Sequence, residues 1–256
     1  NPRSCYRPVV MPTITEQAIC IRQWDFSETS QTVSLFGRET GIFRGIAKGS
    51  RRPKSNFSGG LDLLTLGDVV SIIKPGRDLA TITEWGLNKV WWRIRRDAAA
   101  NRVAYFMAEC SSRMFNQHDP HPGVFDALIN GLDRLEDDMN QDIVLARFLW
   151  LLLVDSGYKP DLEITPANID TNTQTILFSP REGGVVDGPE VPGRWRVRVS
   201  TLSILETIIQ ERSMIDMDPF SVNRAAKLLA AYVREILGSE PTTLGLVFPD
   251  LAGGRV

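Results

Sequence analysis

Cysteine and histidine are scarce in this chain. Its 256 residues include three cysteines, Cys5, Cys20 and Cys110, and two histidines, His118 and His121. Three widely spaced thiols make neither a disulfide framework nor a thiolate metal site, which fits a reducing compartment. Neither histidine stands near a serine or cysteine in a nucleophile motif such as G-x-S-x-G. The sequence therefore predicts no catalytic residue and no cofactor, and we expect the chain not to be an enzyme.

Long hydrophobic runs are also lacking. The longest, Phe148 to Val154, is far shorter than the roughly 20 residues that a membrane-spanning helix needs. No basic segment followed by an apolar run and a small-residue cleavage site is evident. We expect a soluble, cytoplasmic and nucleoid-associated protein with no membrane partner. Residues 1–13 are predicted to be a loose lead-in, within which Met11 is a candidate for the natural start.

The charge of the chain is unevenly distributed. The net charge is −2. Residues 1–86 nevertheless hold eleven Lys and Arg against eight Asp and Glu, whereas residues 87–256 hold eighteen against twenty-three. A basic first part followed by an acidic second part predicts an anionic partner for the first part.

The hydrophobic pattern changes type along the chain. Five short runs between residues 14 and 86 are rich in Val, Ile, Thr and aromatic residues, which predicts a small β-barrel. Apolar residues at steps of three and four then predict helices over residues 97–115, 123–139, 140–157, 200–212 and 218–238.

These patterns predict an α+β protein of two domains. The barrel domain spans residues 14–86, and an all-helical domain spans residues 87–240, followed by a tail over residues 241–256. Residues 159–198 interrupt the helical pattern with five prolines and a Gly-Gly pair. They are expected to form an irregular lobe with one short strand near residues 173–179.

Helix ends are marked by particular residues. Asp218 followed by Pro219 predicts the start of the last helix, and Gly238 predicts its end. Gly157 is expected to cap the helix before the lobe. For the helix over residues 200–212, a capping box at Ser203 and Glu206 and a cap at Ser200 or Thr201 remain alternatives.

Residues 41–60, GIFRGIAKGSRRPKSNFSGG, combine a strand-like run with a basic loop. Cations held close together on a barrel and its loops attract phosphates without reading base sequence. The residues predicted to bind nucleic acid share a positive charge and a place in the barrel domain. They are Arg22, Arg38, Arg44, Lys48, Arg51, Arg52, Lys54, Lys74 and Arg77. Of these, Arg22, Lys74 and Arg77 belong only if their side chains face outward.

Four aromatic residues lie among these cations. They are Trp24, Phe26, Phe43 and Phe57. Exposed rings beside cations would stack on the bases of a single strand. The alternative is that the rings fill the barrel core and the arginines only improve solubility, and both readings stay open.

Specific motifs resemble the RecO family of bacterial recombination mediators. Residues 27–30, Ser-Glu-Thr-Ser, enter the second predicted strand, and residues 47–51, Ala-Lys-Gly-Ser-Arg, end the third. The resemblance continues through FSGGLDLLTLGDVV at residues 57–70 and ARFLWLLLVDSGYKPDL at residues 146–162. It reappears in LLAAYVREILG at residues 228–238 and covers most of residues 14–240.

The resemblance implies an OB-fold barrel followed by a helical domain. It also implies binding of single- and double-stranded DNA and annealing of complementary strands. The expected protein partners are RecR and the C-terminal tail of single-stranded DNA-binding protein, with RecF and RecA involved indirectly. Such a mediator helps to load recombinase onto coated single strands without covalent chemistry.

One departure concerns the lobe. Many members of the family carry two C-x-x-C pairs there, which hold zinc. The corresponding positions here are Thr165 and Asn168, then Asp187 and Glu190. Without thiolates these residues make a poor zinc site, so no structural metal is predicted.

Arg147 stands in the apolar segment IVLARFLWLLLV. A charge there is costly unless it is paired or reaches the surface. One interpretation is an ion pair at the edge of a helix. The other, implied by the resemblance, is an interaction with the acidic tail of single-stranded DNA-binding protein.

Two other functions remain as alternatives. The chain could be an unrelated OB-fold protein that binds RNA or single-stranded DNA. It could also be a metal-dependent phosphoesterase that uses His118, Asp119 and His121, although the prolines of this loop exclude a helix.

Overall fold

The computed structural model describes residues 13–57, 61–74, 76–164, 170, 172, 174–211 and 217–253. The chain divides into two compact units. The barrel unit contains the residues up to Val90 together with Gln117–Pro120, and the helical unit contains Trp91–Asn116 and the residues from His121 onward. The predicted lead-in lies, apart from Thr13, outside the described residues. No helix in the described part of the chain is both long and apolar enough to cross a membrane.

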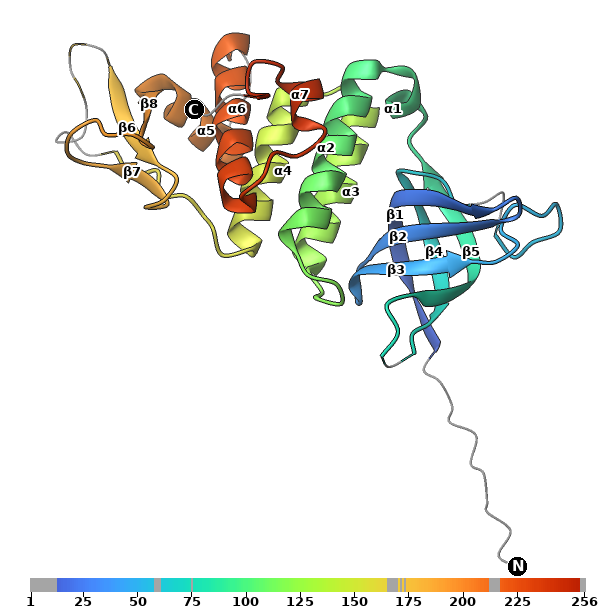
Figure 1. Cartoon of the computed structure of the whole chain (residues 1–256). Helices are drawn as coiled ribbons and strands as arrows, with labels where there is room; N and C mark the ends of the chain where they lie inside the picture. Colours follow the sequence, from blue (N-terminus) through green and yellow to red (C-terminus); the bar gives the residue numbers. More distant parts are fainter. Residues whose placement is uncertain are drawn as a thin grey trace, which may run out of the picture. The chain divides into compact units, whose positions relative to one another are not determined.

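Five strands form the barrel unit (Figure 1). They are β1 (Thr13–Ser27), β2 (Ser30–Gly37), β3 (Gly41–Ala47), β4 (Thr65–Ile72) and β5 (Ala80–Val90). They close in the order β1-β2-β3-β5-β4. Neighbouring strands are antiparallel except β3 and β5, which are parallel. All five predicted β runs are therefore strands, and β5 continues beyond residue 86.

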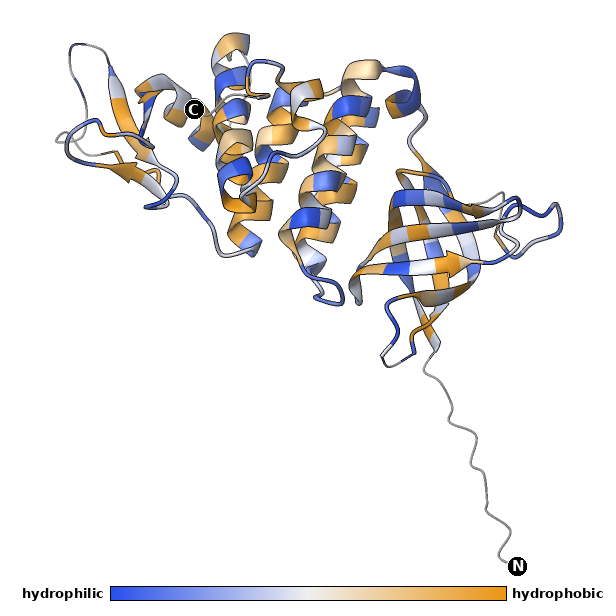
Figure 2. Ribbon diagram, in the orientation of Figure 1, coloured by the Kyte–Doolittle hydropathy of each residue, from blue (hydrophilic) through white to orange (hydrophobic). Residues whose placement is uncertain are grey.

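The barrel core comes from the alternation of side chains along each strand. Hydrophilic and hydrophobic residues alternate along these strands in Figure 2, because successive side chains point to opposite faces. Phe43, Phe57 and Trp85 are buried inside. Gly67 makes room for Trp85, since a Cβ atom there would lie 2.6 Å from the indole ring. Of the two readings left open for Phe43 and Phe57, the structure shows the core position, because both rings are buried in the barrel core.

The described part of the helical unit contains seven helices. They are α1 (Trp92–Arg96), α2 (Ala98–Met114), α3 (Pro122–Glu136), α4 (Gln141–Asp155), α5 (Val199–Ile209), α6 (Pro219–Leu237) and α7 (Leu244–Val247). Helix α4 contacts α2, α3, α5 and α6. This central place explains why its sequence is apolar nearly all round. The short helices α1 and α7 were not predicted.

Cap residues mark both ends of α6. The Asp218 carboxylate accepts hydrogen bonds from the N–H groups of Phe220 and Ser221, and Gly238 ends α6 with φ of 65°. These predictions for α6 are confirmed. The predicted caps of α5 are wrong, because Arg198 occupies the cap position without a side-chain hydrogen bond. The Ser203 hydroxyl donates instead to the carbonyl oxygen of Val199 inside the helix.

The lobe contains a small antiparallel sheet rather than one strand. Its strands β6 (Thr175–Ser179), β7 (Gly184–Val186) and β8 (Trp195–Arg198) lie in the order β7-β6-β8. Two of them are too short to show a period in the sequence. Phe178 of β6 is buried between Trp195 and Tyr232 of α6, with ring centroids 5.7 Å and 5.5 Å away. This aromatic packing fastens the sheet to the helices.

Candidate nucleic-acid interface

The outer face of β1, β2 and β3 carries a cationic and aromatic surface. Ser34 of β2 lies between Arg22 of β1 and Arg44 of β3 in the strand register. Trp24 lies two residues from Arg22, hence on the same face. The side chains of Arg22, Trp24 and Arg44 are exposed. We call Arg22, Trp24 and Arg44 the strand surface.

Trp24 and Arg44 meet each other across the sheet. The guanidinium carbon of Arg44 lies 5.5 Å from the centroid of the Trp24 ring. A cation–π interaction at an exposed site is worth about 0.5–1 kcal/mol. Trp24 keeps 41% of its surface exposed. The arrangement therefore offers an aromatic face and a positive charge at one place.

The loop that follows β3 is fastened beside the β1–β2 turn. The Gly49 N–H donates to Ser30 Oγ over 3.1 Å, and Ser50 Oγ donates to Gln31 Oε1 over 2.9 Å. The Arg51 N–H donates to the carbonyl oxygen of Thr29 over 3.2 Å. These bonds hold the basic loop next to the end of the strand surface.

The cations of this loop differ in their surroundings. Arg51 forms an ion pair with Asp25 of β1, an acid that the local sequence around the loop did not reveal. Lys48, Arg52 and Lys54 are exposed and make no ion pair with any residue that the structure describes. We call Lys48, Arg52 and Lys54 the loop cations. They are the side chains most available to phosphate groups.

The other predicted cations lie at the opposite end of the strands. Arg38 follows β2, in the turn before β3, and its guanidinium lies 3.5 Å from Glu39. Lys74 and Arg77 follow β4, whose last residue Ile72 pairs with Thr13 at the start of β1. The nine predicted cations thus form two groups rather than one continuous patch.

A buried carboxylate shapes the turn that carries Arg38. Glu16 Oε2 accepts the N–H groups of Glu39 and Thr40 over 2.7 Å and 3.0 Å. A Cβ atom at Gly37 would lie 2.5 Å from this carboxylate, so a larger residue there would displace the Glu16 side chain. The buried Glu16 carboxylate of β1 therefore fixes the turn between β2 and β3 through these two hydrogen bonds.

Arg147 lies on α4 in the helical unit and pairs with Glu211, two residues after the end of α5. Arg134 of α3 lies 3.6 Å from the same carboxylate. Burial disfavours the charged form and Arg134 repels it, so the pKa of Arg147 is lowered from its ordinary value. Its Nη1 atom is buried and has no hydrogen-bond partner among the described residues. The structure thus shows the ion pair that was one of the two interpretations of Arg147.

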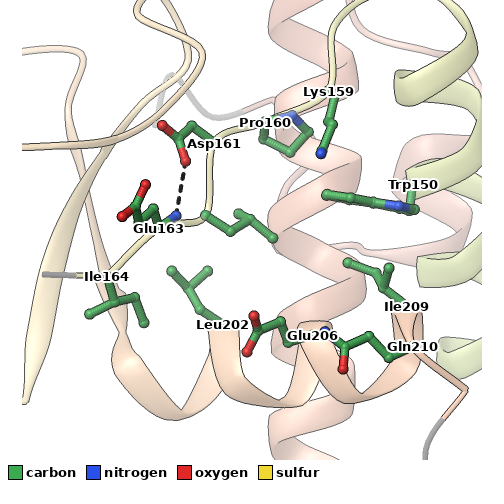
Figure 3. Close-up of a pocket in the computed structure, with 11 residues that line it drawn as sticks. Trp150, Lys159, Pro160, Asp161, Glu163, Ile164, Leu202, Glu206, Ile209 and Gln210 are labelled. Atoms are coloured by element: carbon green, nitrogen blue, oxygen red, sulfur yellow. Dashed lines mark hydrogen bonds between the residues drawn. The ribbon is translucent and has the colours of Figure 1, made fainter.

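A cavity of about 790 Å³ lies beside α4 and α5 (Figure 3). Trp150, Leu202 and Ile209 give it apolar walls, and the Lys159 ammonium lies 5.9 Å from the Trp150 ring. The carboxylates that line it are those of Asp161, Glu163 and Glu206. Arg147 is not among its described lining residues. With three acids and one cation, this cavity is chemically unlike a site for an acidic tail.

The two histidines have separate surroundings. His118 belongs to the barrel unit, and its backbone N–H donates to the carbonyl oxygen of Ile42 over 2.9 Å. His121 belongs to the helical unit, where Nδ1 lies 2.5 Å from Asp155 Oδ2 and the ring stacks on Phe115. The structure does not bring the side chains of the predicted His118–Asp119–His121 set together: among the described residues, no three His, Cys, Asp or Glu side chains form a cluster that could hold a metal ion.

Four positions in the lobe correspond to the cysteines of the C-x-x-C pairs, and the structure describes two of them, Asp187 and Glu190. Thr165 and Asn168 lie outside the described residues. Glu190 pairs with Arg196 over 2.7 Å. The carbonyl oxygen of Asp187 accepts from Arg194 Nη1 over 2.9 Å. The described positions therefore interact with arginine.

Comparison with known proteins places both units in one family. The profile described as "Recombination protein O N terminal" matches residues 11–90, and the one described as "Recombination protein O C terminal" matches residues 95–244. The chain is 28% identical over 237 residues to the DNA repair protein RecO of Dehalococcoides mccartyi strain CBDB1, covering 89% of this chain and 92% of that protein.

Two further relatives agree. The DNA repair protein RecO of Salinibacter ruber is 31% identical over 185 residues, which is 71% of each chain. That of Rhodopirellula baltica is 27% identical over 209 residues, covering 80% of this chain and 77% of the relative. With two family profiles that together span most of its length, the chain belongs to the RecO family of recombination proteins.

Proposed function

We propose that this chain is a DNA repair and recombination mediator that acts by binding, without covalent chemistry. It binds single- and double-stranded DNA and anneals complementary strands. It helps to load recombinase onto single strands coated with single-stranded DNA-binding protein, together with RecR, and with RecF and RecA as indirect partners. Membership of the RecO family supports a role in DNA repair, because the relatives are named DNA repair proteins.

The barrel is proposed to be an OB-fold. Its strand order, β1-β2-β3-β5-β4, and the parallel pair of β3 and β5 support this assignment. OB-folds bind oligonucleotides on the face of strands 2 and 3 and with the loops after strands 1 and 4. Lys74 and Arg77 belong to the loop after β4, so the second group of cations also has a place in such an interface.

The strand surface and the loop cations carry the proposal. A base stacked on an aromatic side chain contributes about 1–3 kcal/mol, and cations beside it bind the backbone. Trp24, with Arg44 over its ring, supplies the stacking face. Lys48, Arg52 and Lys54 supply charge that no described acid neutralises by an ion pair. Such interactions bind DNA without selecting a sequence.

Arg147 is proposed to bind the acidic tail of single-stranded DNA-binding protein. Leu151 and Val154 are exposed on α4, one and two turns after Arg147, on the same side of the helix. Arg134 adds a second guanidinium nearby, since both arginines lie close to Glu211. Exposed apolar side chains beside two arginines suit a tail with an aromatic side chain and carboxylates. Glu211 would have to leave when the tail binds.

The test is the annealing of two complementary labelled oligonucleotides coated with single-stranded DNA-binding protein, without nucleotide or metal. The chain should accelerate annealing, and the acceleration should disappear when the coating protein lacks its acidic tail. Arg147→Ala should reduce the acceleration on coated strands while leaving annealing of bare strands unchanged.

Three other results would count against the proposal. DNA binding without accelerated annealing would leave a nucleic-acid-binding module only. Tighter binding of RNA than of single-stranded DNA would favour the RNA-binding alternative. Equal annealing with intact and tail-less coating protein would remove the role of Arg147.

A further inference from the structure

Helix α1 presents an aromatic ring and two guanidinium groups on one face. Trp92, Arg95 and Arg96 are spaced i, i+3 and i+4, so their side chains lie on the same side of the helix. All three are exposed, and Trp92 keeps 59% of its surface in contact with solvent. Ile94, on the other side, is buried. Helix α1 therefore buries Ile94 but exposes its largest apolar side chain, that of Trp92.

The exposed ring stands on a firmly held helix. The indole N–H of the buried Trp91 donates to Asp133 Oδ1 over 2.5 Å. The Arg93 N–H donates to Glu136 Oε2 over 2.9 Å, and Arg93 Nη1 donates to the carbonyl oxygen of Leu135 over 2.8 Å. These bonds fasten the first turn of the short helix, and the residue before it, to α3. The exposure of Trp92 is thus a consequence of how α1 is anchored.

The acids around α1 already have partners on the protein. Asp133 and Glu136 accept the bonds just described, and Asp97 and Asp138 both pair with Arg93. Asp97 also caps α2 through the N–H groups of Ala99 and Ala100. The exposed Arg96 and Arg102 form no ion pair with any residue that the structure describes.

Arg102 of α2 adds a further cation close to α1 in the chain. It is exposed and lies in the second turn of α2, whose cap residue Asp97 directly follows α1. We call Trp92, Arg95, Arg96 and Arg102 the α1 surface. It combines an exposed ring with cations, as the strand surface of the barrel does.

We propose that the α1 surface is a second binding site for single-stranded nucleic acid, with a base stacked on Trp92 and phosphates on the arginines. Stacking of this kind tolerates any base, and binding of phosphate by arginine carries no sequence information. All of the site's residues belong to the helical unit. This second site goes beyond the proposed function. Its consequence for annealing, that a chain with two binding sites can hold two complementary strands, rests on the proposed function.

Photo-crosslinking locates the site directly. The full-length chain is irradiated with a thymidine oligonucleotide that carries iodouracil, and the modified tryptophans are mapped by mass spectrometry. We expect adducts on Trp92 as well as Trp24. The adduct on Trp92 should persist in the barrel variant K48E/R52E/K54E. An adduct on Trp24 without one on Trp92 would overturn this inference and leave the proposed function standing. An adduct on Trp92 alone would support this inference and count against the barrel surface that carries the proposed function.

Matched variants test the energetic contribution. We expect W92A/R96E/R102E to bind a thymidine oligonucleotide roughly tenfold more weakly, and to lower the salt dependence by about 0.7 in log–log slope for each phosphate that the variant no longer binds. The control F220A/R181E/R198E likewise replaces one exposed aromatic residue with alanine and two exposed arginines with glutamate elsewhere in the helical unit, where Phe220 keeps 76% exposure. Circular dichroism confirms that both variants are folded. Equal affinities of the two variants for the oligonucleotide would contradict the proposal.

Discussion

Trp24 and Trp92 are exposed tryptophans in a chain that buries Trp85 and Trp91 completely or nearly so. Leaving these indoles partly exposed forgoes part of the roughly 1.5–3 kcal/mol that full burial of a large apolar side chain contributes. Neither exposed ring is isolated, because Arg44 lies over Trp24 and Arg95 and Arg96 share the helix face of Trp92. At the scale of single residues, an exposed ring beside arginine is a feature that single-stranded nucleic acid can use.

The first prediction concerns Trp24. Replacing it with alanine removes the stacking face but no charge, so single-strand affinity should fall by roughly tenfold, at about 1–3 kcal/mol for one base. The salt dependence should stay unchanged because no cation is removed. Trp24→Phe should recover part of the affinity. Fluorescence anisotropy over a series of salt concentrations measures both quantities, and a variant with normal affinity would exclude Trp24 from the binding surface.

Several elements are held in place by one carboxylate each. Glu109 of α2 accepts the N–H groups of Thr242 and Thr243 over 2.9 Å each, and the Thr243 hydroxyl over 2.6 Å. It thereby fastens the segment before α7 onto α2. Burial alone would raise the pKa of Glu109, but the bonds from Thr243 and Thr242, with Arg113 nearby, outweigh burial and lower it.

The second prediction follows from the direction of this shift. Because the pKa of Glu109 is lower in the folded chain than in the unfolded one, its stabilisation is complete above the unfolded pKa. The stabilisation is lost as the pH falls through the folded pKa. Glu109→Gln should therefore destabilise the chain by about 1–3 kcal/mol at pH 7 and by less in acid. Urea unfolding at pH 7 and at acid pH measures the free energy of unfolding of the variant and the parent. Glu240→Gln, at an exposed position, is the control. A pH-independent difference between Glu109→Gln and the parent would contradict the assignment.

Elements of the lobe are joined by arginine. Arg194 Nη2 pairs with Glu182 over 3.0 Å, and its Nη1 donates to the carbonyl oxygens of Asp187 and Pro189. Arg196 pairs with Glu190 and Asp170. Together with the buried Phe178, these interactions explain how the described part of the lobe is stabilised by side chains.

At the scale of the whole molecule, the local charge matters more for binding than the total charge. The chain has a net charge of −2, yet its first 86 residues carry an excess of cations. Salt screens exposed charges over about 10 Å at 0.1 M. A DNA strand on the barrel therefore responds mainly to charges within about this distance.

The third prediction tests that locality. Reversing the loop cations in K48E/R52E/K54E should weaken single-strand binding strongly and flatten its salt dependence. Reversing Arg51 should cost less than reversing Arg52, because Arg51 is already paired with Asp25. Binding is measured between about 50 and 200 mM salt, a range in which phosphate binding dominates the change. An unchanged salt slope in the triple variant would exclude the loop as a phosphate-binding site.

Local patterns predicted much of the fold. The five β runs and the longer helices are visible in the sequence because their periods repeat over many residues. Helix α1 and strands β7 and β8 escaped prediction because they are too short for a period to show. The outward direction of Trp92 was missed for the same reason, although the sequence WWRIRR combines rings and cations in six residues.

By itself the sequence determined the succession of elements, the basic character of its first part and the resemblance to RecO, because each depends on neighbours along the chain. Only the tertiary structure decided that Phe43 and Phe57 face the core, that Arg44 meets Trp24 and that Asp25 pairs with Arg51. It also separated the nine cations into two groups. These outcomes depend on strand register and barrel closure, which bring together residues far apart in the chain and leave no local signal in the sequence.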